Sequence, residues 1–329
     1  MADNKKYKVA AIGNAMLDVL CEVPELFLDQ EGIAKGAMNL VSRQRSNDIL
    51  KLVRPIKETA GGSAANTIST LAKLGLKTGY IGKIADDQKG KVFKKDLIDN
   101  SIIYNTEFLD KSNSASTGKC IVLITPDKER TMNTYLGATE HLSDTDIDEE
   151  LIAHSEWLYL EGYRFDGQES KGAFYKAIEI AKKNNTKIAI TLSDSFCVDR
   201  HRSDFIYLLN GSADLVFCNE DELKSLYKVK TIEAAQKFIA DTISCVACTC
   251  AEKGAYLFDK SSIRRISTNK VSVIDTTGAG DNFAAGFLYG LSKKFSLERC
   301  AALGNEIAGE VLKVYGPRIE KSLKNFVRN

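Results

Sequence analysis

The sequence contains few of the residues that mark specialised protein classes. Its 329 residues include four prolines, one tryptophan and three histidines, and 45 basic residues almost cancel 44 acidic ones. No histidine lies near the cysteine cluster at positions 245–250, so a closed zinc site is not expected. A net charge of +1 gives no reason to expect nucleic acid or an anionic membrane as a partner.

Long apolar runs, a secretory leader pattern, internal repeats and low-complexity tracts are also missing. The chain has no run of about 18 or more apolar residues, and its start is polar. We therefore expect a cytoplasmic protein whose partners are small molecules. Three of the eight cysteines, Cys245, Cys248 and Cys250, lie in a run typical of a buried strand, and they fit free thiols in a reducing compartment.

Apolar strand patterns alternate with helical patterns along most of the chain. This alternation predicts an α/β fold with a largely parallel sheet that is covered on both faces. The expected strands lie at 7–13, 78–84, 156–160, 187–192, 214–217 and 245–249, and the helices between them include 170–183 and 231–242. Segments 17–41 and 104–136 break the rhythm with short strand-like runs.

The heptad Asp275–Asp281, D-T-T-G-A-G-D, joins a carboxylate to a glycine turn at the start of an apolar helix. Backbone N–H groups at such a turn lie at the positive end of the helix dipole and can hold phosphate or a developing oxyanion. A carboxylate beside that group is suited to take a proton from an attacking hydroxyl. The pattern favours phosphoryl transfer to an alcohol. The alternative is a plain strand-to-helix turn, in which the glycines only relieve backbone strain.

The heptad matches the D-T-x-G-A-G-D signature of the ribokinase-like (PfkB) family of carbohydrate and nucleoside kinases. A second segment, Ala60–Thr67, resembles the G-G-x-x-x-N signature of that family. The resemblance covers nearly the whole chain. It implies a three-layer αβα fold with a mostly parallel central sheet and a small β-sheet lid. Asp281 would be the catalytic base, and the amides of Gly278, Ala279 and Gly280 would form the anion hole.

The family resemblance also implies an acceptor site near the N-terminus. Asn14 and Asp18 follow a short apolar strand, and the matching residues in relatives hold sugar hydroxyls. Gly62, Ser63 and Asn66 would complete this site. From the residues alone, Asn66 also fits a structural role in the first helical turns, and Asp18 fits an ion pair with an unidentified Arg or Lys.

Several matches imply an ATP site. Asn219 and Glu222 fit the N-x-x-E motif, whose glutamate orders the Mg²⁺ water shell in relatives. They also fit an ordinary N-cap and acidic first turn. Three further residues resemble nucleotide contacts: Thr249, Gly254 and Asn305. Cys250-Ala251 departs from the family pattern in that loop, and Asn305 also fits a plain helix contact.

Two further predictions complete the site that the resemblance implies. Asp275 and Thr277 resemble the monovalent-cation site of some relatives, so K⁺ is a possible cofactor beside ATP and Mg²⁺. Arg130, at a lid position that is often basic, is a candidate phosphate contact. We expect a single unit over residues 1–329, with lid segments at about 15–45 and 103–137, as a monomer or homodimer.

The acceptor is expected to be a ribonucleoside, with adenosine as the first choice. The N-terminal motifs are most similar to bacterial adenosine kinase-like sugar kinases. Tyr163 and Phe196 fall where adenosine kinases carry aromatic residues, and aromatic faces can stack on a purine; both also fit the core. A free-sugar kinase acting on ribose, fructose or a ketogluconate is the close alternative. A non-catalytic nucleoside-binding protein is the remote one, and the absence of a G-x-G-x-x-G turn after Gly13 disfavours a dinucleotide-dependent oxidoreductase.

Overall fold

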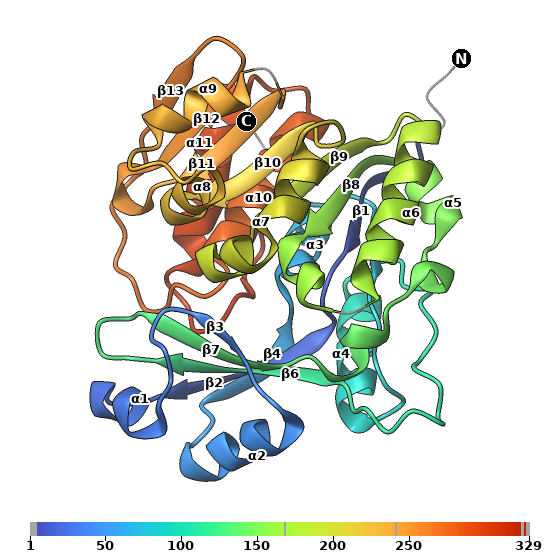
Figure 1. Cartoon of the computed structure of the whole chain (residues 1–329), viewed down its shortest axis with the longest axis vertical. Coiled ribbons are helices and arrows are strands. Elements are labelled where there is room, and N and C mark those ends of the chain that lie inside the picture. The colour runs from blue at the N-terminus through green and yellow to red at the C-terminus, as the bar shows by residue number, and fades with distance from the viewer. Residues whose placement is uncertain (1–4, 168, 241, 324–325, 327–329) are drawn as a thin grey trace.

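A computed structural model describes residues 5–167, 169–240, 242–323 and 326, and places them in two sheets with helices around them (Figure 1). The large sheet has the order β13-β12-β11-β10-β9-β8-β1-β5. Strands β5, β1, β8, β9, β10 and β11 run parallel to one another, β12 pairs antiparallel with β11, and β13 pairs antiparallel with β12. In sequence order these strands are β1 (Tyr7–Ile12), β5 (Thr78–Ile81), β8 (Ser155–Glu161), β9 (Lys187–Thr191), β10 (Leu215–Asn219), β11 (Cys245–Thr249), β12 (Ala255–Phe258) and β13 (Ile263–Ile266).

Helices cover both faces of the large sheet. One face packs on four helices: α3 (Ser63–Lys73), α4 (Gln88–Asp99), α10 (Ala279–Ser292) and α11 (Leu297–Val311). The other face packs on α5 (Glu149–Ala153), α6 (Ser170–Lys183), α7 (Ser195–Leu209), α8 (Glu220–Tyr227) and α9 (Gln236–Ile239). Short 3₁₀ turns lie in the connections of the described chain: η1 (Gly137–His141), η2 (Asp144–Asp146), η3 (Gly162–Asp166), η4 (Glu233–Ala235) and η5 (Ala251–Lys253).

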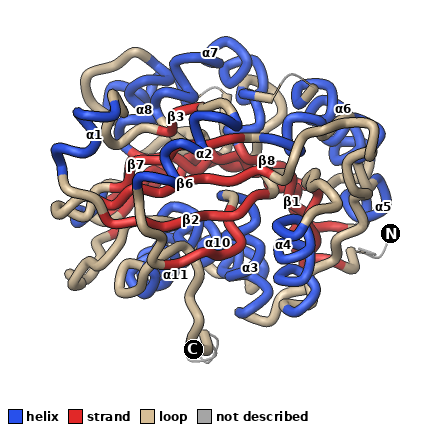
Figure 2. Tube along the Cα trace, turned by 90° about the horizontal axis from the view of Figure 1, so that it is seen from below, coloured by secondary structure: helices blue, strands red, loops and turns tan. Residues whose placement is uncertain are grey.

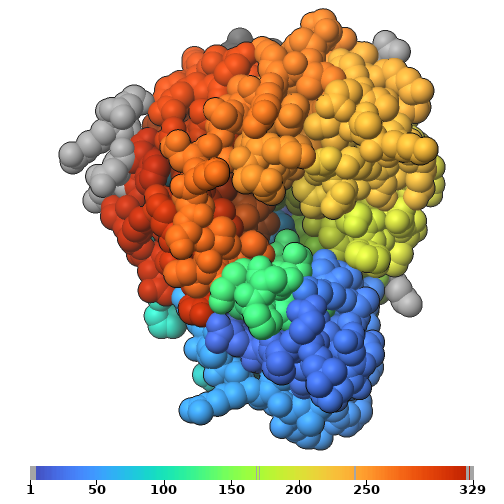
Figure 3. Space-filling model, turned by 90° about the vertical axis from the view of Figure 1, so that its left-hand side faces the viewer, coloured from blue at the N-terminus to red at the C-terminus, as the bar shows by residue number. Residues whose placement is uncertain are grey.

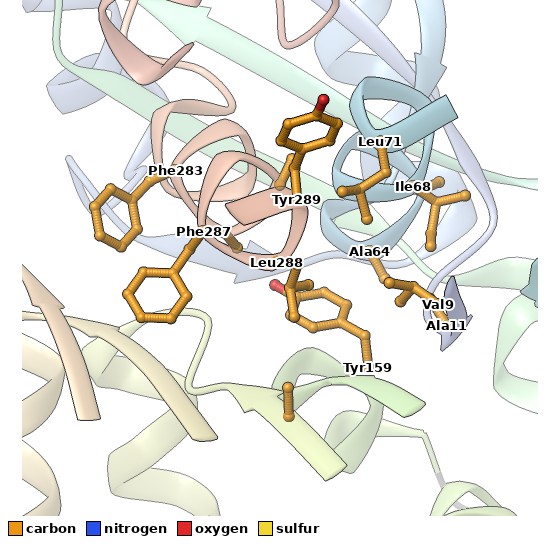
Figure 4. Packing of buried hydrophobic residues seen from close by; sticks show 14 of the residues in the cluster. Val9, Ala11, Ala64, Ile68, Leu71, Tyr159, Phe283, Phe287, Leu288 and Tyr289 are labelled. Carbon is orange, nitrogen blue, oxygen red and sulfur yellow. The ribbon is translucent and has the colours of Figure 1, made fainter. Parts of the chain in front are cut away.

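The side chains of α10 and α3 form the centre of the first of these layers. Phe283, Phe287 and Leu288 of α10 are buried in the same cluster as Ile68 and Leu71 of α3 (Figure 4). Small residues let the helices approach closely, because a Cβ added at Gly286 would lie 2.8 Å from the Cα of Gly304 in α11. The shared cluster thus packs α3 against α10, and the glycine contact packs α10 against α11.

A second, smaller sheet lies across one end of the large one (Figures 1 and 2). Its order is β3-β7-β6-β2-β4, with β2 (Met16–Glu22), β3 (Met38–Leu40), β4 (Lys57–Gly61), β6 (Gly118–Ile124) and β7 (Arg130–Tyr135). Strand β4 lies outside the segments 15–45 and 103–137 that the sequence predicts for a lid. It joins the sheet because it continues directly into the glycine turn that opens α3.

The second sheet buries both of its faces. One face packs Ile121 and Leu123 of β6 with residues of α1 (Glu25–Glu31) and α2 (Arg43–Leu52). The opposite face carries Cys120 and Val122, which line a cavity between this sheet and the large one. Side chains on a strand alternate between faces, so β6 is apolar throughout.

The predicted helix over 231–242 is wrong in extent. The structure has a 3₁₀ turn there, followed by α9, and residue 241 lies outside the described part of the chain. An i to i+3 hydrogen bond from Ala235 N to Ile232 O tightens the first turn. Among the described helices, none is both long enough and apolar enough to cross a membrane.

Candidate active site

A cavity of about 800 Å³ lies between the second sheet and the carboxyl ends of the parallel strands. Figure 3 shows the surface hollowed where the blue and green residues of the second sheet meet the body above them. Residues at or just after five strand ends line this cavity: Asn14, Glu161, Thr191, Asn219 and Thr249. Ligands of open α/β sheets bind at this edge.

Asp281 lies in the first turn of α10, next to a glycine turn that a larger residue could not form. Gly278 is the N-cap of this helix and has φ 77°, and a Cβ there would lie 2.6 Å from the Cβ of Pro317. Gly278, Ala279 and Gly280 all line the cavity. The start of a helix is therefore next to a carboxylate, as the heptad predicts, and Ala279 N donates to Thr276 O at 3.2 Å.

The carboxylate of Asp281 is held by the N-terminus of α3. Ser63 Oγ donates to its Oδ1 at 2.6 Å, and Asn66 Nδ2 donates to its Oδ2 at 2.8 Å. Burial raises the pKa of Asp281 above its usual range, while these two hydrogen bonds and the more distant Arg130 and Arg318 lower it. The group is an anchored carboxylate with no ion pair among the described residues, which suits a general base.

The predicted acceptor residues Asn14, Asp18, Gly62, Ser63 and Asn66 all line the cavity. Gly62 has φ 90°, and a Cβ there would lie 2.0 Å from the carbonyl oxygen of Asn14. The glycine turn can therefore form only without a side chain. It brings the loop after β1 against the start of α3.

Asp18 projects from β2 toward the cavity without a hydrogen-bond partner among the described residues. It is 5% exposed, and burial raises its pKa to about 7, against the opposing effect of Arg318. A Cβ at Gly61 would lie 2.1 Å from its carboxyl carbon, so that glycine provides the space for it. A buried carboxylate without a partner is costly, which indicates that a ligand completes the site.

Three lining or supporting residues were missed from the sequence. Glu161, at the end of β8, accepts hydrogen bonds from Asn14 N at 3.2 Å and Ala64 N at 2.8 Å, and burial raises its pKa to about 7. Its position at a strand end could have pointed to it. Asp194 and Arg164 had no such local signal.

Asp194 connects the second sheet to the large one. Its Oδ2 accepts from Met38 N of β3 at 3.2 Å and from the hydroxyl of Tyr163 at 3.3 Å. Its Oδ1 accepts from Cys197 N at 2.6 Å and caps α7. A second connection runs from Thr276 Oγ1 to Lys128 O at the β6–β7 turn, at 3.3 Å. The two sheets are thus joined on two sides of the cavity.

Of the two aromatic residues predicted to stack on a purine, only Tyr163 lines the cavity. Phe196 lies outside it, with 48% of its side chain exposed. The cap at Asp194 and the first helical residue, Ser195, take the places at the cavity, and the helix turns Phe196 away. The predicted contact of Phe196 is therefore absent from this structure. Arg130 lines the cavity and contacts the sulfur of Met132 at 3.5 Å.

The residues predicted at the nucleotide end also line the cavity: Asn219, Thr249, Gly254, Gly278, Gly280 and Asn305. Asn219 and Glu222 form a reciprocal N-cap at the start of α8, with Glu222 Oε1 accepting from Asn219 Nδ2 at 2.6 Å. Burial raises the pKa of Glu222 to about 8. The structural alternative for this pair is thus present, and its role toward magnesium stays a prediction. Asn305 donates to the carbonyls of Ile266 and Ser267, both at 3.2 Å.

Asp275 organises the turn before Gly278. Its Oδ1 accepts from the N–H and the hydroxyl of Thr277, at 2.8 and 2.7 Å, and its Oδ2 accepts from Gly316 N at 2.7 Å. These bonds account for its burial, and a monovalent cation at Asp275 and Thr277 stays a prediction. Among the described residues, no group of three histidine, cysteine, aspartate or glutamate side chains is arranged to hold a metal ion.

Residues 316–319 join the two helix starts of the site. Pro317 O accepts from Asn282 Nδ2 at 3.1 Å on the α10 side. Arg318 donates to Ala60 O at 3.1 Å and Ala65 O at 3.0 Å on the α3 side. This segment therefore connects the turn before Asp281 to the glycine turn at Gly62.

Comparisons with known proteins agree with this architecture. A family model described as pfkB family carbohydrate kinase matches residues 31–323. The chain is 26% identical over 319 residues to a 5-dehydro-2-deoxygluconokinase of Bacillus licheniformis, covering 94% of this chain and 91% of that protein. It is 29% identical over 278 residues to the same kinase of Listeria innocua, covering 79% of this chain and 84% of that protein.

Solved structures give a second view. The adenosine kinase from Sinorhizobium meliloti is similar with a TM-score of 0.95 at 39% identity, covering 98% of this chain and 99% of that one. A probable sugar kinase protein from Rhizobium etli is similar with a TM-score of 0.94 at 37% identity, covering 98% and 97%. The ribokinase-like α/β fold with a second small sheet, predicted from the sequence, is confirmed.

Proposed function

The chain belongs to the pfkB family of carbohydrate kinases, and we propose that it transfers the γ-phosphoryl group of ATP to a primary hydroxyl of a ribonucleoside, with adenosine as the first choice. The observation that carries the kinase chemistry is the position of Asp281. Its anchored carboxylate lies in the first turn of a helix whose N-terminal residues Gly278, Ala279 and Gly280 line the same cavity. One group takes the proton of the attacking hydroxyl, and the N–H groups stabilise charge on the transferring phosphoryl group.

We propose that Gly278, Ala279 and Gly280 serve as the anion hole and that Thr249, Gly254 and Asn305 border the nucleotide. Asn305 would act through the carbonyls of Ile266 and Ser267 that it holds. Mg²⁺ usually keeps several waters and binds substrate phosphates with one or two carboxylates, so the one carboxylate of Glu222, which lines the cavity, would be enough to order its water shell. The ion would supply charge neutralisation of the phosphates. Arg130, which belongs to the second sheet and lines the cavity, is the cation that would pair with phosphate charge from that side.

The choice of a nucleoside rests on the cavity wall provided by the second sheet. Strand register places Met16, Cys120, Val122, Met132 and Met38 on one face of that sheet, lining the cavity. Methionine sulfur packs favourably against aromatic rings, and Tyr163 faces the same space. A flat apolar base fits such a wall better than a small polyol does.

The charged residues at the acceptor end of the cavity also favour a nucleoside. Asp18, Glu161 and Asp194 line it, with Arg130 as the one basic side chain among the described lining residues there. A sugar acid such as 5-dehydro-2-deoxygluconate would bring a fourth carboxylate beside these three. The name shared by the sequence relatives keeps a free-sugar kinase as the second candidate, with Arg130 as the group that would receive the sugar carboxylate.

We further propose that the protein acts as a monomer. The outer face of the second sheet, which would otherwise be free to pair with another subunit, is covered by α1 and α2 and packs Ile49 and Leu28 against Ile121 and Leu123. The cytoplasmic location expected from the sequence stays a prediction.

The deciding experiment measures ATP-dependent phosphorylation of adenosine beside ribose, fructose, 2-keto-3-deoxygluconate and 5-dehydro-2-deoxygluconate, with Mg²⁺ and with K⁺ present or absent. We expect kcat/KM to be highest for adenosine. Turnover of a free sugar alone would leave the chemistry at Asp281 in place and remove the nucleoside assignment. No turnover of any acceptor would count against the kinase proposal itself.

A further inference from the structure

Arg164 lies beneath the acceptor end of the cavity, behind Asn14. It is fully buried, belongs to η3, and is not among the residues that line the cavity. Its Nη1 donates to Asn14 Oδ1 at 2.9 Å, to Thr139 Oγ1 at 3.3 Å and to the carbonyl of Thr139. The carboxylate of Glu161 supplies the nearest opposite charge.

The hydrogen bonds around Asn14 have a fixed direction. Arginine can only donate, so the atom that faces Arg164 must be the amide oxygen of Asn14. Thr139 Oγ1 receives bonds from Ala15 N and Arg164, and it donates its one proton to the same Asn14 Oδ1, at 3.3 Å. Both donors to Oδ1 therefore come from below the cavity floor.

The orientation of the Asn14 amide follows from these bonds. Its Nδ2 has no hydrogen-bond partner among the described residues and is not fully enclosed by protein atoms, and Asn14 lines the cavity. The NH₂ group therefore faces the acceptor. Four positions along the chain, Asp18 presents an unpartnered carboxylate to the same space. The floor thus offers donors at Asn14 and an acceptor at Asp18.

We propose that Arg164 is a positioning residue for acceptor selectivity: it locks the Asn14 amide so that Asn14 can only donate to the acceptor molecule. A hydroxyl group of the acceptor at this point accepts a hydrogen bond from Asn14 and donates one to Asp18. Two neighbouring hydroxyls can also make one of these hydrogen bonds each. The site therefore selects acceptors that carry a hydroxyl there over those that lack it. This inference rests on the proposed kinase function and deepens it.

The test compares hydroxyl selectivity in Arg164→Met, a variant of similar length without donors. For wild type and variant, kcat/KM is measured with adenosine, 2′-deoxyadenosine and 3′-deoxyadenosine. A site with an unpaired polar group discriminates by about 10-fold or more, so wild type should prefer adenosine to at least one deoxy analogue by that factor. In Arg164→Met the preference should shrink several-fold, through KM for the acceptor, with KM for ATP unchanged.

A structural role alone would lower stability or turnover for every acceptor equally and leave the ratio between analogues unchanged. Asn14→Ala should show the same reduced ratio, and the double variant should show no further loss. Arg200→Met is the matched control. Arg200 pairs with Asp166 outside the cavity, so the ratio should stay at the wild-type value.

Thr139→Val provides a second variant if Arg164→Met does not fold. It removes one donor to Asn14 Oδ1, and it should shift the ratio in the same direction by a smaller factor. An unchanged ratio in the folded variants overturns the inference. Inactivity of the wild type on all acceptors counts instead against the proposed function, and if wild type uses a free sugar, deoxy forms of that sugar replace the nucleosides.

Discussion

Ser63 Oγ donates a hydrogen bond of 2.6 Å to Asp281 Oδ1, across 218 positions of the chain. The start of α3 therefore holds the candidate base at the start of α10. In this structure, two side chains predicted to bind the acceptor, Ser63 and Asn66, are bonded to the base itself. An acceptor hydroxyl that reaches Asp281 would enter or replace this pair of bonds.

Replacing the base tests the mechanism. Asp281→Asn keeps the size of the side chain and removes its ability to take a proton, so kcat should fall by about 100-fold or more. Binding of the acceptor, measured by calorimetry, should change little. Turnover close to wild type would remove Asp281 from the mechanism. Loss of turnover with binding intact would also exclude a protein that only binds nucleosides.

The hydrogen bond from Ser63 should set the pH profile. Burial raises the pKa of Asp281, and the Ser63 bond lowers it by stabilising the ionised form. Since the base must be ionised, activity should rise with pH through this pKa, which lies above the ordinary aspartate range. In Ser63→Ala the rising limb of kcat/KM should move to higher pH. A limb at the wild-type position would mean that another group controls it.

Asp18 links acceptor binding to stability. Its pKa is about 7 in the folded protein against 3.8 for an ordinary aspartate. Between these values the unfolded chain releases the proton and the folded chain keeps it, so the free energy of unfolding falls as pH rises from about 4 to 7. Asp18→Asn should therefore raise Tm, by more at pH 8 than at pH 5, and should also raise KM for the acceptor. Equal changes in Tm at the two pH values would contradict this account.

Asp194 should control closure of the second sheet over the cavity. Asp194→Ala removes the acceptor of the Met38 N–H and the cap of α7. Water should then compete better as phosphoryl acceptor, so ATP hydrolysis without acceptor should increase while KM for the acceptor rises. Asp194→Asn is the matched control, because asparagine also caps helices and accepts from an N–H. Equal hydrolysis in all three proteins would refute the prediction.

The two aromatic positions should differ. Tyr163 lines the cavity and Phe196 does not, so Tyr163→Ala should raise KM for adenosine by about 5-fold or more, as expected for loss of a base-stacking contact. Phe196→Ala should leave KM near the wild-type value. Steady-state kinetics on both variants decide this. A large effect at Phe196 alone would show that the purine binds outside the cavity as it stands.

Short glycine motifs made most of the site predictable from the sequence. Gly62 and Gly278 have positive φ and lie close to other atoms. Only glycine meets both requirements, so each turn is visible as a short motif in the sequence, and Asp281 and Asn66 lie close to these glycines in the same motifs. The alternation of strand and helix patterns predicted the fold because each of these patterns can also be recognised within a single segment.

The missed residues act at long range. Arg164 reaches Asn14 across 150 positions, and Asp194 reaches Met38 across 156. The first contact depends on the pairing of β1 with β8, and the second depends on how the two sheets come together. No segment encodes either arrangement by itself. Phe196 was misplaced for a related reason: its neighbour Asp194 caps α7, and the cap decides which way the helix turns its first residues.

The hydrogen bonds of residues 316–319 to both helix starts affect the order in which the protein folds during synthesis. Chains are made from the N-terminus, and their parts begin to fold as they emerge. Both sheets are complete in sequence by Ile266. The partner of Asn282, Pro317, and the partner of the α3 turn, Arg318, come about fifty positions later. A nascent chain can therefore hold its whole sheet architecture before the glycine turn at Gly278 is fixed, and the candidate site takes its final form only after residues 316–319 have emerged.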